Sequence, residues 1–228
     1  MSSHHPSSEL LKKFAEGRLD GSLASVASAH LEHCSACQKF VRSAEEKLAS
    51  SAFGSVAQVS TAEAREAWKA ISSRMNAPKS HDPVSQSEIF INGVQFILPR
   101  ALHKLAAKPI KWMPFGKGGK ISKLGDESGK SLFLIYLSSN EEVPMHSHEG
   151  SEHSYVIAGS YSADGFTFNT GDFTVSNEAV THAPKAGSED GCLLLSSVEN
   201  RLNFFQGWMK PFNALLWWIL NLRVKFIK

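Results

Sequence analysis

The segment that most constrains this chain is His30-Leu-Glu-His-Cys-Ser-Ala-Cys37. His30, Cys34 and Cys37 occupy positions i, i+4 and i+7, which on one helix fall within about 60° of each other. One imidazole and two thiolates lack one ligand for tetrahedral zinc, and structural zinc sites are usually closed by four protein ligands. The spacing therefore predicts a structural zinc site whose fourth ligand comes from elsewhere in the chain.

The nearest source of a fourth ligand is the amino terminus, where His4 and His5 precede a helical pattern. His33 lies closer to the edge of the same stripe, and spacing alone does not exclude it. Two alternatives to zinc remain open: a pair of reduced cysteines beside a solvated histidine, or a redox-active Cys-x-x-Cys pair. The redox alternative usually comes with a βαβ pattern, which this part of the sequence lacks.

The composition limits the class of protein. The chain has 228 residues, 42% of them hydrophobic, which is enough for one large or two modest domains with a real core. A net charge of +2 gives no basis for direct nucleic-acid binding. Three cysteines, two of them in one motif, favour a reducing compartment over a disulfide framework. With a polar start and no run of roughly 18 to 20 apolar residues, we expect a cytoplasmic protein without a transmembrane segment.

Two kinds of pattern follow each other along the chain. Helical periodicity with capping residues dominates the first part, whereas short apolar runs separated by turn residues begin at Glu88 and are typical of a jelly roll. A polar, proline-containing stretch between them is typical of a linker. We therefore predict a two-domain α+β chain: a small all-α zinc-binding domain at 1–76, a linker at 77–87, an all-β jelly-roll barrel at 88–211 and an apolar, basic tail at 212–228. Strands are expected at 110–115, 121–124, 132–137, 154–157, 166–168, 173–175 and 192–195.

Within the helical part, continuous spacing from Leu23 to Val41 predicts one helix, and Asp20-Gly21 predicts a turn before it. Such short helices bury little apolar surface, so we expect a bound metal ion to supply additional stability. Structural zinc in small modules contributes on the order of 10 kcal/mol or more.

The last predicted helix carries an apolar stripe. The sequence from Ser60 to Glu63 offers a capping box for it. Trp68, Ile71 and Met75 then recur at helical spacing. This stripe either packs internally against the first helices or forms a docking face for another protein.

A second candidate metal site lies among the predicted strands. His146 and His148 are two residues apart, so on a strand both point to one face. The intervening Glu149-Gly-Ser151 can bend the chain and return Glu152 toward that face, and His182 follows downstream. Three imidazoles and one carboxylate inside a barrel suit a divalent first-row metal. The alternative is a set of unrelated polar surface residues.

The remaining features are less specific. Cys192 lies in an apolar run and is expected to be a buried strand thiol, with a redox role near the metal as the alternative. The tail at 212–228 is aromatic and ends in basic residues, but its apolar part is too short to span a bilayer. It either covers the barrel, forms a dimer seam or lies on a membrane surface as a peripheral helix.

These motifs together resemble the ChrR-type zinc-binding anti-sigma factors, in which a zinc anti-sigma domain precedes a cupin. The resemblance covers nearly the whole chain, but residues 214–228 are longer and more aromatic than the family's usual end. The family's two metal motifs correspond to His5, His30, Cys34 and Cys37, which favours His5 over its neighbour, and to His146, His148, Glu152 and His182 in the cupin.

The resemblance implies a regulator and not an enzyme. The zinc domain would bind an extracytoplasmic-function-type (ECF) sigma factor and block its access to RNA polymerase, with the helix of Trp68, Ile71 and Met75 docking on it. The cupin would hold zinc, iron or manganese, sense singlet oxygen or organic hydroperoxide, and trigger release. A dioxygenase-type cupin metalloenzyme with an attached helical domain is the main alternative. A purely structural cupin is a third possibility.

Overall fold

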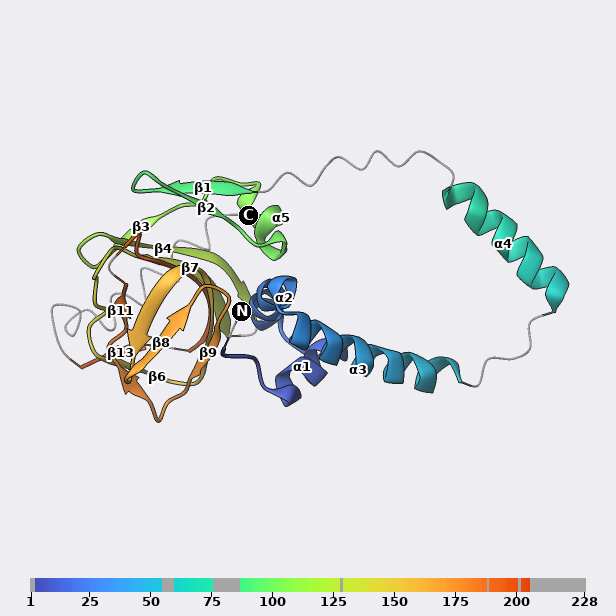
Figure 1. The fold of residues 1–228 in the computed structure, drawn as a ribbon, viewed down its shortest axis with the longest axis horizontal. Helices are drawn as coiled ribbons and strands as arrows, with labels where there is room; N and C mark the ends of the chain where they lie inside the picture. Colours follow the sequence, from blue (N-terminus) through green and yellow to red (C-terminus); the bar gives the residue numbers. More distant parts are fainter. Residues whose placement is uncertain are drawn as a thin grey trace.

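The computed structural model describes residues 3–54, 60–75, 87–127, 129–187, 189–200 and 202–205. The chain begins with helices and continues into antiparallel strands that curl into a barrel (Figure 1), which confirms the predicted α+β fold class. The helices are α1 (Ser8–Ala15), α2 (Gly21–His33), α3 (Ser35–Phe53), α4 (Thr61–Met75), the short 3-10 helix η1 (Arg100–Leu102) and α5 (His103–Ala106).

The strands form three antiparallel groups. They are β1 (Glu88–Ile91), β2 (Val94–Ile97), β3 (Met113–Phe115), β4 (Gly119–Glu127), β5 (Lys130–Leu137), β6 (His146–His148), β7 (Glu152–Ala163), β8 (Phe166–Asn169), β9 (Phe173–Ser176), β10 (Thr181–His182), β11 (Lys185–Ala186), β12 (Cys192–Glu199) and β13 (Leu202–Phe204). The large sheet has the order β11-β7-β12-β5-β4-β3, with β8 and β9 also paired to β7. The small sheet has the order β10-β6-β13, and β1 and β2 form a hairpin. Each predicted strand overlaps an observed one.

Strand β12 lies at the centre of the large sheet and is buried along almost its whole length. Cys192 and Leu194 contact the apolar cluster inside the barrel, whereas Leu193 and Leu195 contact a cluster on the outer face. Successive side chains of a strand point to opposite faces, so both faces of β12 are covered. The Cys192 thiol is fully buried as expected, and burial raises its pKa to about 12.

Helix α2 covers the outer face of this sheet (Figure 1). Its Val26, Ala27 and Ala29 are fully buried and belong to the same apolar cluster as Tyr155 and Leu193. Two of these three side chains are alanines, so the helix backbone approaches the strands closely. The helices therefore gain apolar burial from the sheet as well as from each other, a source that their own sequence pattern does not reveal.

The prediction of a single helix from Leu23 to Val41 is wrong. Helix α2 ends at His33 and α3 begins at Ser35, with the intervening Cys34 in an extended conformation (φ −103°, ψ 98°). The Cys34 carbonyl accepts the first bond of α3 from the Gln38 N–H (3.0 Å), and Gln38 Nε2 donates to the Leu31 carbonyl at the end of α2 (2.6 Å). These bonds satisfy backbone groups at the break, which neither glycine nor proline marks in the sequence.

The expected turn at Asp20-Gly21 is instead the start of α2. Asp20 is the N-cap, and its carboxylate accepts a hydrogen bond from the Leu23 N–H (2.9 Å) and pairs with Lys130 of β5 (3.1 Å). The capping box of α4 is present as predicted, because the Ser60 N–H donates to Glu63 Oε2 (3.1 Å) and the Glu63 N–H donates to Ser60 Oγ (3.3 Å).

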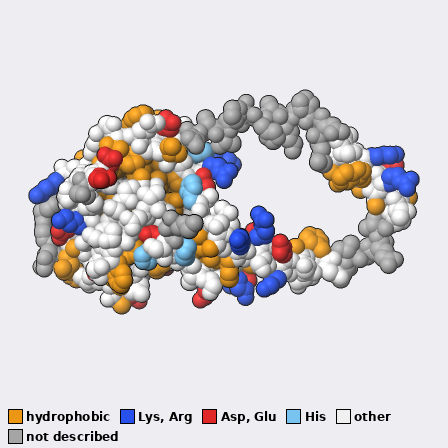
Figure 2. Space-filling model, viewed as in Figure 1, with side chains coloured by type: hydrophobic (Ala, Val, Ile, Leu, Met, Phe, Trp, Pro, Cys, Tyr) orange, Lys and Arg blue, Asp and Glu red, His pale blue; other side chains and the backbone are white. Residues whose placement is uncertain are grey.

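Helix α4 lies apart from the other described elements (Figures 1 and 2). The side chains of Trp68 and Ile71 are 63% and 51% exposed, so the described residues of α1–α3 do not cover this stripe. The side chain of Met75 lies outside the described set, as do residues 77–86 of the predicted linker and the tail at 212–228. Among the helices described here, none is both long and apolar enough to cross a bilayer.

The contribution of the α2 N-cap to the stability of the protein can be tested by substitution of Asp20. We expect Asp20→Ala to lower the free energy of unfolding by about 1 kcal/mol, because the first turn of α2 loses its acceptor. Asp20→Asn keeps an acceptor but not the charge, so its loss should be smaller. Urea unfolding of both variants measures this, and equal losses would contradict the capping role.

Candidate metal centres

Four side chains meet where the amino terminus reaches the break between α2 and α3. The ligand atoms of His5, His30, Cys34 and Cys37 all lie within 4.8 Å of one another. His5 Nδ1 is 3.5 Å from His30 Nε2, and it is 3.4 Å and 3.6 Å from the sulfurs of Cys34 and Cys37. In a tetrahedral zinc site with ordinary bond lengths, neighbouring nitrogen and sulfur ligands are about 3.5 Å apart. The separations from His5 therefore suit a tetrahedral ion.

The buried histidine of this group is oriented by the barrel. His30 is fully buried, and its Nδ1–H donates to the carbonyl of Gly171 (3.0 Å), so its Nε2 faces the other ligands. The rings of Tyr155 and Phe173 lie edge-on around it, with centroids 6.1 Å and 5.9 Å away. Burial lowers the pKa of His30, which favours the neutral imidazole that a metal needs.

The thiols of this group are also buried. Burial, together with the neighbouring Cys34, raises the pKa of Cys37 to about 12, so without a metal Cys37 is a thiol at neutral pH. A metal ion must therefore displace its proton on binding, and the affinity of the site must rise with pH.

The other histidines near this group point elsewhere. The ring of His4 lies against Phe168 (centroids 4.8 Å apart), and its Nδ1 is 3.4 Å from Asp172 Oδ2. His33 is exposed at the end of α2 and does not belong to the group. Of the candidates that the spacing left open, the geometry brings only His5 to the cysteines.

A second group lies inside the barrel, between the two sheets. His146 and His148 come from one face of β6, His182 comes from β10 directly opposite His146, and Glu152 is the first residue of β7. The Nε2 atom of His182 is 3.0 Å from that of His148 and 3.1 Å from that of His146. Glu152 Oε2 is 3.2 Å from His148 Nε2. All four residues predicted for the barrel site thus converge.

Further residues hold this group in place. His146 Nδ1–H donates to the Pro144 carbonyl (2.9 Å), which turns its Nε2 toward the centre. The hydroxyl of Ser154 donates to Glu152 Oε1 (2.9 Å) and lies 2.6 Å from the hydroxyl of Ser196. Neither serine was predicted as part of this site, although Ser154 follows Glu152 by two residues on the same face of β7 and could have been found from this spacing.

The charges of the barrel group suit a cation. Burial lowers the pKa of His146 to about 4 and also lowers that of His182, so these imidazoles are neutral near pH 7. Burial alone would raise the pKa of Glu152, but the three imidazoles and the Ser154 hydroxyl outweigh it and lower that pKa. A carboxylate beside the neutral rings of His146 and His182 leaves a negative charge that a divalent metal would offset.

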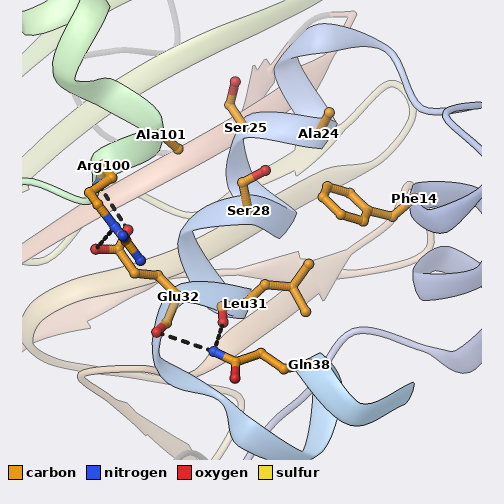
Figure 3. Close-up of a pocket in the computed structure, with 9 residues that line it drawn as sticks. All are labelled: Phe14, Ala24, Ser25, Ser28, Leu31, Glu32, Gln38, Arg100 and Ala101. Atoms are coloured by element: carbon orange, nitrogen blue, oxygen red, sulfur yellow. Dashed lines mark hydrogen bonds and ion pairs between the residues drawn. The ribbon is translucent and has the colours of Figure 1, made fainter. Parts of the chain in front are cut away.

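A surface groove of about 500 Å³ lies between the helices and η1 (Figure 3), and none of the candidate metal ligands lines it. Phe14 and Leu31 form part of its apolar wall. At its edge, Arg100 donates through its backbone N–H (2.8 Å) and its side chain (3.3 Å) to Glu32. This pairing ties α2 to the segment before the barrel.

Comparison with known proteins gives consistent matches. Residues 102–200 match the family described as the ChrR Cupin-like domain. The anti-sigma-E factor ChrR of Cereibacter sphaeroides is 23% identical over 210 residues, which cover 88% of this chain and 92% of the relative. The crystal structure of Rhodobacter sphaeroides SigE in complex with the anti-sigma ChrR matches with a TM-score of 0.64 and 21% identity, covering 87% of this chain and all of that one. The predicted resemblance to the ChrR-type anti-sigma factors, with a cupin-like domain at its barrel, is thus confirmed.

Proposed function

We propose that this chain is an anti-sigma factor. Its helical part binds an ECF-type sigma factor and keeps it from RNA polymerase, and its metal-loaded cupin senses oxidative stress and triggers release. The observation that carries the proposal is that one chain contains two groups of four potential metal ligands. Over most of its length, the fold of this chain is similar to that of a protein solved in complex with a sigma factor. The site of action is the cytoplasm, where RNA polymerase works.

The exposed stripe of α4 supports a protein partner. Trp68 and Ile71 leave large apolar side chains in water, and Met75 continues their spacing along the helix. Burying such side chains in a complex is worth roughly 1.5 to 3 kcal/mol each. We assign this stripe to the contact with the sigma factor, as an amphipathic helix that lies in an apolar groove of its partner.

The ligand groups favour different metals. Two thiolates and two imidazoles are typical of structural zinc, which would hold the amino terminus against the α2–α3 break. Three imidazoles and one carboxylate accept zinc, iron or manganese in the cupin. A bound cupin metal would supply a reactive centre for singlet oxygen or an organic hydroperoxide, and the four residues named here would hold it.

Release of the partner requires a difference in affinity between two states of the cupin. A stimulus that affected both states equally would pass no signal to the helices. A shift of roughly 3 to 5 kcal/mol would change the occupancy of the sigma factor decisively. The relative that aligns over most of the chain is named as an anti-sigma factor, so a dioxygenase activity is not our main proposal.

The first test removes the thiolates. We expect a Cys34→Ala/Cys37→Ala double variant to lose zinc from the helical site and to stop inhibiting the co-expressed sigma factor, because two of the four ligands are gone. Reporter transcription and metal analysis of the purified protein measure this. His33→Ala, a histidine exposed next to the site, is the control and should keep both properties. Unchanged inhibition in a zinc-free double variant would contradict the proposal.

The second test concerns the stripe on α4. We expect Trp68→Ala with Ile71→Ala to weaken binding of the sigma factor at least a hundredfold, since two buried anchors of roughly 1.5 to 3 kcal/mol each are lost. Calorimetry with the purified sigma factor measures the dissociation constant. Phe90→Ala, which truncates an equally exposed aromatic side chain on β1, is the matched control and should bind as the unaltered protein does.

The third test separates sensing from binding. We expect His146→Ala with His148→Ala to keep inhibition of the sigma factor but to blunt its release under singlet oxygen or organic hydroperoxide, because the cupin loses two metal ligands. Reporter induction in stressed and unstressed cells measures both effects. A normal response in this variant would show that the cupin metal is not the sensor, while leaving the anti-sigma role intact.

A further inference from the structure

The segment that carries His5 is attached to the barrel through one carboxylate. Asp172, which is 1% exposed, lies in the turn between β8 and β9. Its Oδ1 accepts hydrogen bonds from the backbone N–H of Ser3 (2.7 Å) and of His4 (3.2 Å), and its Oδ2 accepts one from Asn169 (2.9 Å). Two of these backbone donors belong to the amino-terminal segment, so the buried carboxylate holds this segment against the turn.

Two further bonds tie the same turn to the helical ligands. The Phe173 N–H donates to the carbonyl of His4 (3.0 Å), immediately before His5. The carbonyl of Gly171 accepts from His30 Nδ1 (3.0 Å). Gly171 has φ 97°, a conformation that side-chain-bearing residues rarely adopt, so the turn depends on glycine at this position. Two of the four helical ligands are therefore positioned by residues of the barrel.

The turn between β8 and β9 is also hydrogen-bonded to β7, the strand that begins at the cupin ligand Glu152. The Gly171 N–H donates to the Val156 carbonyl (2.9 Å), and the Val156 N–H donates to the Asp172 carbonyl (3.0 Å). Val156 lies on β7, four residues after Glu152, which is about 13 Å along a strand. A short, regular backbone path thus joins the cupin ligand Glu152 to the contacts of His30 and His5.

We propose that Asp172 and Gly171 are positioning residues of the helical metal site, so that the cupin domain sets the zinc affinity of the helices. The Gly171 carbonyl orients His30, and the Asp172 carboxylate holds the segment that brings His5 to the cysteines. This inference rests on the proposed zinc occupancy of the helical site. Partners that orient metal ligands typically contribute 10- to 100-fold in metal affinity.

The arrangement also couples the two metal sites. Metal binding in the cupin that shifts β7 or its turn relative to α2 would change the zinc affinity of the helical site by some factor. By linkage, zinc at the helical site would then change the metal affinity of the cupin by that same factor. Such coupling gives the proposed sensor a direct physical route to the helices that bind the partner, with the zinc ligands themselves as the element that responds.

The experiment uses the full chain and cobalt as the probe. Thiolate-to-cobalt absorption reports only the site of Cys34 and Cys37, because the cupin group contains no thiol. Zinc competition against this band, with a chelator as buffer, gives the zinc affinity of the helical site. We expect Asp172→Ala to weaken it about tenfold or more, and Asp172→Asn, which keeps one acceptor oxygen but loses the charge, to weaken it in the same direction but less.

Asp190→Asn in the exposed turn before β12 is the control and should leave the affinity unchanged. Wild-type zinc affinity in both test variants overturns the inference. If Asp172→Ala fails to fold, Asp172→Asn decides. An unaltered protein that shows no thiolate–cobalt band would instead remove the proposed zinc occupancy itself.

Discussion

The hydrogen bond from His30 to the carbonyl of Gly171 is the contact on which the arrangement of the molecule depends. It fixes one metal ligand of α2 to a turn of the barrel. The bond is buried beneath α2, beside the rings of Tyr155 and Phe173. A buried imidazole without this acceptor would have an unsatisfied N–H, which is costly in an apolar environment. The same bond therefore stabilises the packing of α2 and fixes which nitrogen of His30 faces the metal site.

The two ligand groups solve the problem of a buried metal site in different ways. The negative charge of the helical group comes from thiolates that form only when a metal binds. Burial raises the pKa of Cys37 so far that without a metal ion the neutral thiol is favoured. The barrel group keeps a carboxylate ionised with the help of the Ser154 hydroxyl and the surrounding imidazoles. The first group therefore suits a structural metal ion, and the second suits a metal ion that can also bind a reactant.

Sequence patterns predict the parts of these groups that follow local periodicity. The two-residue spacing of His146 and His148 places both on one face of β6, and the capping box at Ser60 is present as expected. The break at Cys34 could not be predicted, because the bonds that satisfy it come from Gln38 and no breaking residue is present. The docking of α2 on the sheet and the contact from Asp172 to Ser3 join residues far apart in sequence, which no single periodicity encodes.

The double burial of β12 has a consequence for how the protein comes apart. Its outer leucines share one core with Leu23 and Val26 of α2, so α2 and the barrel form two sides of a single apolar layer. Cleaving the chain between α4 and β1 and pulling the pieces apart would uncover that layer on both of them. Each fragment would then be prone to aggregate, and melting of the intact chain should be one cooperative event in which α2 and the barrel are lost together.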